Sequence, residues 1–363
     1  MMKKGKTLLA VLLMLISVVA SASVKIVPEP VEIHEYSGKF TLPSEVTISD
    51  FRDGKMVDTY IELSSKILKT KGVALKKGGK NSTVKLSISK KIKGEGEYII
   101  EVGKRDIRIQ AADEDALWCG LQTLTQLLSQ GVDRQMVIRD EPRFGYRGAM
   151  LDCCRHFFSV EDVKSFIDMM AVHKLNRFHW HLTEDQGWRI EIKKYPRLTE
   201  IGSVRESTYM TNYSGEQCDS FVDKPYGGFY TQDDTRELVK YAHDRHIVTI
   251  PEIEIPGHSV AALASYPWLG CTGGPYKVRV KWGISEDVMC IGKETTWQFI
   301  RDVLDEVCQL FPGELIHIGG DETPRKKWSE CPDCQALMKK EGMTEEAQLQ
   351  SWITTKVENY LET

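Results

Sequence analysis

Residues 315–322 of the 363-residue chain read LIHIGGDE, a short apolar stretch that ends in two glycines and two adjacent carboxylates. The apolar part predicts a buried strand, and Asp321 and Glu322 would then follow its carboxyl end. Three earlier stretches share this plan: YRGAMLD (146–152), NRFHWHL (176–182) and IVTIPEI (247–253). The repeated plan predicts strands whose polar ends contribute to one site.

Helical patterns separate these strands and decide the fold class. Apolar residues recur at helical spacing in 160–173, 233–246, 258–265 and 295–311. Strands that alternate with helices predict βα units and a parallel sheet. Because the polar residues follow the strands, we expect a (β/α)8 TIM-type barrel, whose active site lies at the carboxyl ends of the strands. A doubly wound open sheet is the alternative, since it also binds ligands at strand ends.

The number of βα units predicts that the barrel is incomplete. About four units can be counted in this sequence, whereas a closed barrel has eight. Two further helical stretches, 328–341 and 344–362, follow the fourth strand. We therefore expect residues 144–363 to be the N-terminal half of a catalytic barrel, and the natural coding region to extend further.

Residues 23–143 have a different pattern, typical of a small α+β domain. TVKLSIS (83–89), EYIIEV (97–102) and DIRIQA (106–111) alternate apolar and polar residues, as half-buried antiparallel strands do. A stretch with helical spacing follows at 115–130. This part of the sequence contains no nucleophile, ligand cluster or glycine-rich phosphate loop, so we expect a supporting accessory domain.

Residues 1–22 have the pattern of a secretory signal peptide. Three lysines precede an apolar run over residues 8–20, and Ala-Ser-Ala at 20–22 is a small-residue cleavage site. The run is shorter than the roughly 20 residues of a spanning helix, which argues against an uncleaved membrane anchor. We therefore expect an exported protein, periplasmic or extracellular, that leaves the membrane after cleavage. A net charge of −4 argues against nucleic acid as a partner.

The nine cysteines are an odd number, so at least one thiol has no partner within the chain. Export makes disulfides possible. Cys271 and Cys290 flank a stretch that reads as a surface excursion, and a disulfide between them would close it. Cys331 and Cys334 form a lone CxxC, which without a second pair favours a local disulfide or two free thiols over a zinc site. We expect no metal and no cofactor.

The polar residues at the strand ends point to a sugar more than to a phosphate. Arg155 follows the first strand, and its planar guanidinium suits either two adjacent sugar hydroxyls or a neighbouring carboxylate. His179 and His181 share one face of the second strand, as a metal pair or as packed histidines. Carboxylates follow the second, third and fourth strands, which is the chemistry of glycoside cleavage.

The adjacency of Asp321 and Glu322 limits their roles. Glycosidases place two carboxyl groups on opposite sides of the scissile bond, which neighbours in sequence cannot easily do. We interpret Glu322 as the group that protonates the leaving oxygen. Asp321 would then serve another part of the same sugar, such as a 2-acetamido group whose carbonyl oxygen can attack C1.

The motifs YRGAMLDCCRHFF, NRFHWHLTEDQGWRIEI, PEIEIPGH and HIGGDE, in this order, resemble those of the family 20 glycoside hydrolases, the β-N-acetylhexosaminidases. Residues 24–143 are similar to the N-terminal accessory domain of that family. The resemblance implies removal of non-reducing terminal β-linked N-acetylglucosamine or N-acetylgalactosamine from oligosaccharides or glycoconjugates. It also implies a retaining, substrate-assisted mechanism with an oxazolinium intermediate.

The resemblance implies a role for each matching residue. Glu322 would be the general acid and then the base, buried beside another carboxylate, while Asp321 would orient the acetamido group. On the substrate-binding side it implies Arg155, which would hold ring hydroxyls, and Asp185, which would act through a network with His258. Two further residues would support this network: Glu254 and His317.

Two other functions remain open at this point. A metal-dependent amidohydrolase barrel would use His179 and His181 as ligands. A truncated, non-catalytic carbohydrate-binding protein would keep the motifs but lack the pocket wall that later strands supply in the family. Full turnover in the presence of a chelator would exclude the first, and a substrate assay would separate out the second.

Overall fold

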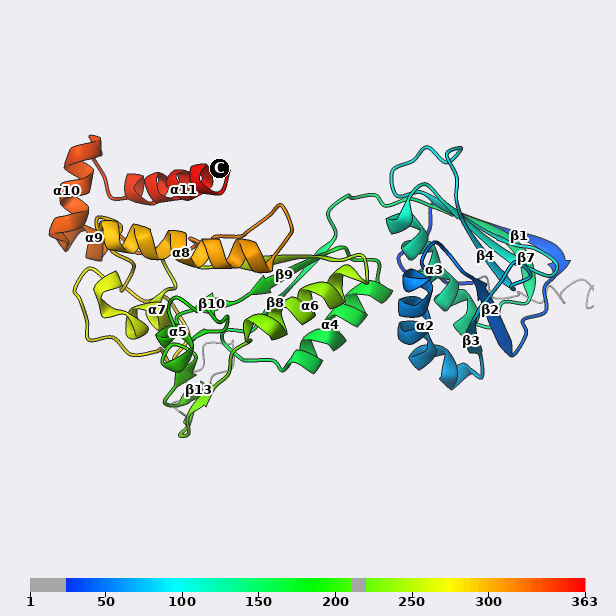
Figure 1. Ribbon diagram of the computed structural model, residues 1–363, viewed down its shortest axis with the longest axis horizontal. Helices are drawn as coiled ribbons and strands as arrows, with labels where there is room; N and C mark the ends of the chain where they lie inside the picture. Colours follow the sequence, from blue (N-terminus) through cyan, green and yellow to red (C-terminus); the bar gives the residue numbers. More distant parts are fainter. Residues whose placement is uncertain (1–23, 211–219, 363) are drawn as a thin grey trace, which may run out of the picture. The chain divides into compact units, whose positions relative to one another are not determined.

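The computed structural model describes residues 24–210 and 220–362, which fall into two units, one ending at Glu141 and the other beginning at Pro142 (Figure 1). The predicted signal peptide, residues 1–22, lies outside the described residues. Across the described ranges, no helix has the length and apolar character needed to cross a membrane.

The first unit is built on a seven-stranded sheet with the order β1-β7-β5-β6-β4-β2-β3. Its strands are β1 (Glu32–Lys39), β2 (Glu45–Ser49), β3 (Ala74–Gly78), β4 (Val84–Ile88), β5 (Tyr98–Val102), β6 (Ile107–Ala111) and β7 (Arg134–Asp140). The three strands predicted from alternation are present as β4, β5 and β6. The expectation of antiparallel pairing holds for β5 with β6 but is wrong for β4, which pairs with β6 in parallel. A short turn joins β5 to β6, and such a turn requires antiparallel strands. No short turn joins β4 to β6, because β5 intervenes in the chain, so β4 can pair in parallel with the other edge of β6.

Helices α2 (Lys55–Leu68) and α3 (Glu114–Ser129) belong to this unit, and a 3-10 turn, η1 (Lys69–Lys71), follows α2. Helix α3, predicted from its spacing, begins where the Asp113 side chain accepts a hydrogen bond from the backbone N–H of Ala116 at 2.7 Å. Gly120 lets the helix lie close to the sheet, because a Cβ there would stand 2.8 Å from Cγ2 of Ile109. The unit therefore has its own core between helix and sheet.

The second unit contains a parallel sheet with the order β16-β9-β8, formed by β8 (Gly148–Asp152), β9 (Arg177–His181) and β16 (Val248–Glu252). The predicted fourth strand continues it as a bridge between Glu252 and His317. The His317 N–H donates to Pro251 O, and the Ile253 N–H donates to His317 O, both at 2.9 Å. Neighbours in the sheet are thus neighbours in sequence, without the reversal of order that a doubly wound sheet requires. The described residues do not form a closed barrel.

Helices follow the strands as predicted: α4 (Val160–Val172), α6 (Gln232–His243), α7 (Val260–Ser265) and α8 (Glu294–Leu310). Capping boxes start α4 at Ser159 and α6 at Thr231. One face of the sheet carries the buried Trp180, whose ring lies 4.7 Å from Tyr230 and 6.2 Å from Phe311. Phe178 stands on the same face, next to Trp180, and its ring lies 5.7 Å from that of Phe166 on α4, so helices cover this face. Figure 1 shows α4 and α6 running beside β8 and β9.

Short elements fill the long loops of the unit. They are β10 (Thr183–Glu184), β11 (Gly187–Trp188), α5 (Arg197–Glu200), β12 (Val204–Arg205), β13 (Thr208–Met210), β14 (Ser220–Val222), β15 (Tyr226–Gly227) and the 3-10 turn η2 (Pro267–Leu269). The helix predicted at 328–341 divides into α9 (Lys326–Glu330) and α10 (Pro332–Glu341), and α11 (Ala347–Leu361) follows. The division occurs because Pro332 has no N–H to continue α9, whereas a proline suits the first turn of α10.

Candidate active site

At the carboxyl ends of the strands, one buried carboxylate contacts three histidines. Glu252 lies 2.7 Å from Nε2 of His179, 2.5 Å from Nδ1 of His181 and 3.0 Å from Nδ1 of His317. Burial alone would raise the pKa of Glu252, but the hydrogen bonds of His179 and His181 outweigh it and hold the pKa well below its usual range. The two histidines that could have been a metal pair therefore face a carboxylate that is ionised.

Arg155 lies between two carboxylates at the ends of the first two strands. Its NH1 is 3.0 Å from Asp152 Oδ2, and its NH2 contacts Glu184 Oε1. The Asp152 side chain also accepts the Arg155 backbone N–H at 3.1 Å. Glu184 is fully buried, whereas Arg155 keeps about a quarter of its side chain exposed (24%). The guanidinium is thus held in one orientation while part of it stays accessible.

Behind this pair, Asp185 and His258 form a buried contact with Glu184. Nδ1 of His258 is 2.8 Å from Glu184 and 3.6 Å from Asp185. The nearby carboxylates of Asp185 and Glu184 raise the pKa of His258 to about 11 despite its burial, so the ring is an imidazolium at neutral pH. Asp185 has no exposed side-chain surface, and its Oδ1 accepts the first N–H of α7, from Val260, at 3.1 Å. Its placement is therefore behind His258, and full burial keeps it from the direct sugar contact that a substrate-binding residue makes.

The other ring nitrogen of His258 faces the adjacent carboxylates of the opening motif. Nε2 is 3.4 Å from Glu322 Oε2 and 3.7 Å from Asp321 Oδ2. Both acidic side chains are more than half exposed, Asp321 at 64% and Glu322 at 55%. The expectation that Glu322 is buried beside another carboxylate is therefore wrong among the described residues, where Glu322 has Asp321 next to it but is more than half exposed.

The two glycines before this pair allow a turn that holds a different carboxyl group. Gly319 and Gly320 have φ values of 61° and 97°, which favour glycine. The Gly320 N–H donates to Glu254 Oε2 at 3.1 Å, and a Cβ on Gly319 would collide with the same carboxyl. Burial, with the charges of Asp321 and two further carboxylates, raises the pKa of Glu254 to about 9. Glu254 is thus the buried, protonated acid of the site.

Two arginines of the site were not predicted. Arg279 lies in the surface excursion, and its NH1 is 3.3 Å from Asp185 Oδ2 while its backbone N–H donates to Asp185 O at 3.0 Å. Arg189 is fully buried and donates to the carbonyl oxygens of Cys153 at 3.1 Å and Cys154 at 2.6 Å. It also donates to the Ser203 carbonyl at 2.6 Å, and so ties the loop after β8 to the loops after β9. Arg279 lies outside the four quoted motifs. Arg189 lies within NRFHWHLTEDQGWRIEI but beyond the end of the strand, so the pattern of polar strand ends does not single it out.

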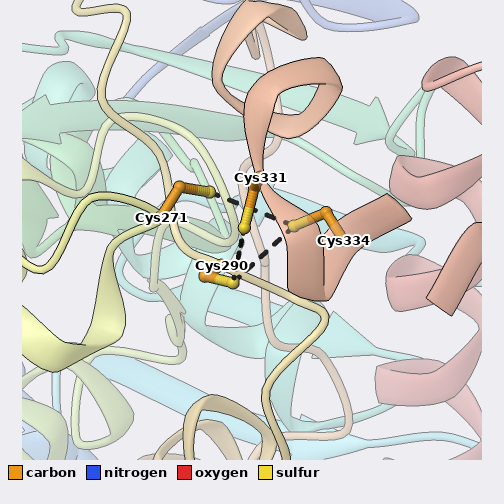
Figure 2. A group of neighbouring side chains, drawn as sticks. All are labelled: Cys271, Cys290, Cys331 and Cys334. Atoms are coloured by element: carbon orange, nitrogen blue, oxygen red, sulfur yellow. Dashed lines mark hydrogen bonds between the residues drawn. The ribbon is translucent and has the colours of Figure 1, made fainter. Parts of the chain in front are cut away.

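The excursion is also held by cysteines. Cys271 and Cys290, the predicted disulfide partners, are both free thiols, and they meet Cys331 and Cys334 in one group (Figure 2). The CxxC motif thus has a second pair of cysteines after all, supplied by a distant part of the chain.

A family model described as "Glycosyl hydrolase family 20, catalytic domain" matches residues 144–363, and one described as domain 2 of the same family matches residues 23–141. A beta-hexosaminidase of Porphyromonas gingivalis is 42% identical over 355 residues, covering 93% of this chain and 44% of the relative. A beta-hexosaminidase of Vibrio furnissii is 42% identical over 272 residues, which is 74% of this chain and 44% of that protein. The chain thus spans less than half the length of these curated relatives.

Solved structures give the same result. The GH20 exo beta-N-acetylglucosaminidase from Vibrio harveyi, in complex with N-acetylglucosamine, superimposes with a TM-score of 0.79 at 33% identity, covering 93% of this chain and 53% of that one. The beta-N-acetylhexosaminidase from Bacteroides fragilis gives 0.75 at 34% identity, covering 94% of this chain and 64% of that one.

Proposed function

The chain belongs to glycosyl hydrolase family 20, and we therefore propose that the protein that contains it is a β-N-acetylhexosaminidase. Its substrates would be oligosaccharides or glycoconjugates that end in β-linked N-acetylglucosamine or N-acetylgalactosamine. The catalytic domain of this family is a TIM barrel, and we propose that the four strands described here form part of one. Their sequential order and the greater length of the relatives support this.

One observation carries the proposal. Asp321 and Glu322 are adjacent, exposed, and both within 3.7 Å of the His258 ring, which is backed by buried carboxylates. Two neighbouring carboxyls on the same side of a sugar cannot act as acid and nucleophile from opposite faces. They can act if the nucleophile comes from the substrate, as the oxygen of a 2-acetamido group does.

In the first step, Glu322 donates its proton to the glycosidic oxygen while the acetamido oxygen attacks C1. The C1–O bond breaks, the protonated aglycone leaves, and a cyclic oxazolinium remains. Asp321, whose Oδ2 lies 3.7 Å from Nε2 of His258, would offset the positive charge of this intermediate and accept the acetamido N–H. In the second step Glu322, now a carboxylate, takes a proton from the water that attacks C1. The configuration at C1 is retained.

Arg155 would bind the ring hydroxyls of the sugar. Asp152 and Glu184 hold its guanidinium in one orientation, so it loses little conformational freedom when it donates hydrogen bonds to a substrate. Two residues would support the loop that carries Asp321 and Glu322, which we call the catalytic pair. His317 would act through its contact with Glu252, and Glu254 through the hydrogen bond from the Gly320 N–H.

The metal-dependent alternative receives less support. His179 and His181, its expected ligands, contact Glu252, and a carboxylate that pairs with histidines accounts for their position. If the protein turns over substrate at the same rate with and without a chelator, the result would agree with the glycosidase proposal.

The remaining assignments are part of the proposal. Residues 23–143 would be the accessory domain, 144–363 would belong to the catalytic barrel, and 1–22 would be a signal peptide that directs export to the periplasm or beyond. The N-terminal residue of the mature protein, determined by mass spectrometry, tests the last of these.

The proposed function is tested by comparing a chromogenic β-N-acetylglucosaminide with the corresponding β-glucoside on the complete protein. We expect turnover of the first and very slow turnover of the second, because the glucoside has no acetamido oxygen to attack C1. Comparable rates on both substrates would contradict the substrate-assisted mechanism and the role of Asp321.

A further inference from the structure

Four cysteine side chains converge between the excursion and the helices that follow the catalytic pair (Figure 2). The Sγ atom of Cys290 is 3.5 Å from that of Cys331 and 3.7 Å from that of Cys334. The Sγ atoms of Cys271 and Cys334 are 4.0 Å apart, and all four sulfurs lie within 4.8 Å of one another. We call these residues the four-cysteine cluster.

These spacings distinguish between a disulfide and a metal. The sulfurs of a disulfide are about 2.05 Å apart. Four thiolates around one zinc ion, with Zn–S bonds of about 2.3 Å in a tetrahedron, stand roughly 3.8 Å from each other. Three of the six sulfur–sulfur separations, 3.5, 3.7 and 4.0 Å, lie on either side of the second value, and all six stay within 4.8 Å. We propose that Cys271, Cys290, Cys331 and Cys334 bind one structural Zn²⁺ ion.

The backbone around the cluster is built for this convergence. Cys331 precedes α10 and Cys334 lies in its first turn, as in a CxxC ligand pair. The loop after Cys290 packs directly on that turn, because a Cβ on Gly292 would lie 2.3 Å from the carbonyl of Asp333. Three of the sulfurs belong to buried residues and the fourth, that of Cys271, to a half-buried one. Such a closed set of four ligands is typical of a structural rather than a catalytic zinc site.

The charge and the ligand type also favour zinc. Thiolates are soft ligands, and a tetrahedral set of four sulfurs selects zinc or iron rather than magnesium or calcium. Four thiolates and one divalent ion leave a net charge of −2. The ammonium group of Lys293 is next to the cluster, where it donates to the carbonyl oxygens of Gly270 at 2.9 Å and Trp268 at 3.2 Å. It can offset part of that charge.

The ion would fix the excursion against the part of the chain that carries Asp321 and Glu322. The excursion holds Arg279 on Asp185, behind His258. Near its end, the excursion is hydrogen-bonded to the loop after β16 and to α9. The Met289 N–H donates to Pro256 O at 3.0 Å, and Met289 O accepts a hydrogen bond from Nε1 of Trp328 at 3.0 Å. Loss of zinc should therefore loosen the support of His258 without removing any group that would touch the sugar.

The first test is the metal content of the purified complete protein that contains this chain, prepared without chelators and measured by elemental mass spectrometry. We expect about one zinc ion per chain, as for one four-cysteine site. Cys331→Ser and Cys334→Ser should lose it, whereas Cys308→Ser should keep it. Cys308 is the matched control, because it is an exposed free thiol on α8 outside the cluster. Zinc retained in both cluster variants would overturn the proposal, as would iron in place of zinc.

A second test needs no variant, and so it does not depend on whether the serine proteins fold. Cobalt(II) exchanged into the wild-type chain should give the intense visible absorption of tetrahedral cobalt thiolate, and a thiol-modifying reagent should release zinc in step with the loss of four thiols. If the intact mass of the native protein shows the four cysteines paired as disulfides, or if the thiols are free and no metal is present, the proposal is wrong. None of these measurements uses glycosidase activity, so they stand apart from the test of the proposed function.

Discussion

At the scale of single residues, His258 connects the buried and the exposed acidic groups of the site. One ring nitrogen is 2.8 Å from the buried Glu184, and the other is 3.4 Å from the exposed Glu322. The ring carries its charge at neutral pH because Asp185 and Glu184 raise its pKa to about 11. The ring therefore links the buried carboxylates to the two adjacent carboxyls that the proposed mechanism uses.

The division of labour between these two carboxyls can be separated by leaving group. We expect Glu322→Gln to lose general acid catalysis, about 10²–10⁴-fold in kcat/KM, and to lose less on aryl glycosides whose leaving group needs no proton. Asp321→Asn should reduce turnover of all acetamido substrates by a similar factor, because the anion acts on the sugar and not on the leaving group. Rates for both variants across a series of aryl β-N-acetylglucosaminides decide this. Parallel slopes for the two variants would contradict the assignment.

A second residue-scale prediction concerns the protonated Glu254. Its folded-state pKa of about 9 lies above the ordinary value of 4.5. The folded protein therefore holds a proton that the unfolded chain releases, and the free energy of unfolding should fall as the pH rises from about 4.5 to 9. The slope from this one group is at most about 1.4 kcal/mol per pH unit.

Glu254→Gln keeps a neutral, hydrogen-bonding side chain and removes that proton. We expect its urea unfolding free energy to change less between pH 5 and 9 than that of the wild type, with the two proteins diverging as the pH rises. Glu314→Gln, at an exposed position, is the control and should follow the wild type. Identical pH profiles for wild type and Glu254→Gln would show that Glu254 is ionised in the folded protein.

At the scale of elements, the turn between the fourth strand and Asp321 depends on glycine for space as well as for conformation. We expect Gly319→Ala to lower the free energy of unfolding by more than the roughly 1–3 kcal/mol that a strained backbone position costs, because its Cβ would also displace the Glu254 carboxyl. Gly342→Ala, at a similar φ of 70° with no atom within 4 Å of the new Cβ, is the matched control. Chemical denaturation of both variants measures the difference. Equal losses would mean that the contact with Glu254 contributes nothing.

The elements themselves could be predicted from the sequence to a large extent. The four strands of the second unit and the helices between them follow from hydrophobic periodicity, and their parallel pairing follows from the alternation of strand and helix. Two predictions were wrong because a periodic pattern does not contain the deciding information. The direction of β4 depends on which strand it meets in space. The helix predicted at 328–341 divides at a single residue, Pro332.

The site could be predicted in its members but less in its arrangement. The residues at strand ends were found because the fold brings those ends together. The exposure of Glu322, the burial of Asp185 and the neutral state of Glu254 depend on packing between loops far apart in sequence. The four-cysteine cluster was missed for the same reason, since its two halves are separated by 40 residues between Cys290 and Cys331.

At the scale of the whole molecule, the second unit leaves three apolar side chains exposed on one face of its parallel sheet among the described residues. Trp180 and its neighbours cover the helix side. On the other side, Met150, Val248 and Leu315 are 47%, 38% and 51% exposed, and their alternation along the strands places them on the face that carries Glu252. In the proposed barrel this face is the interior, which further strands enclose.

This face gives a prediction that distinguishes residues 24–363 from the complete protein. Expressed alone, residues 24–363 should self-associate and bind a hydrophobic dye, because an apolar sheet face and unpaired strand edges meet water. Leu315→Gln should then raise the soluble monomer yield of residues 24–363. In the complete protein the same substitution should lower the free energy of unfolding by about 1.5–3 kcal/mol, the value of burying a leucine side chain. Dye binding, sedimentation and chemical denaturation of both lengths, with and without the substitution, measure these opposite effects. A monomeric, cooperatively folded 24–363 with ordinary turnover, unaffected by Leu315→Gln, would mean that this face needs no cover and that the barrel proposal is wrong.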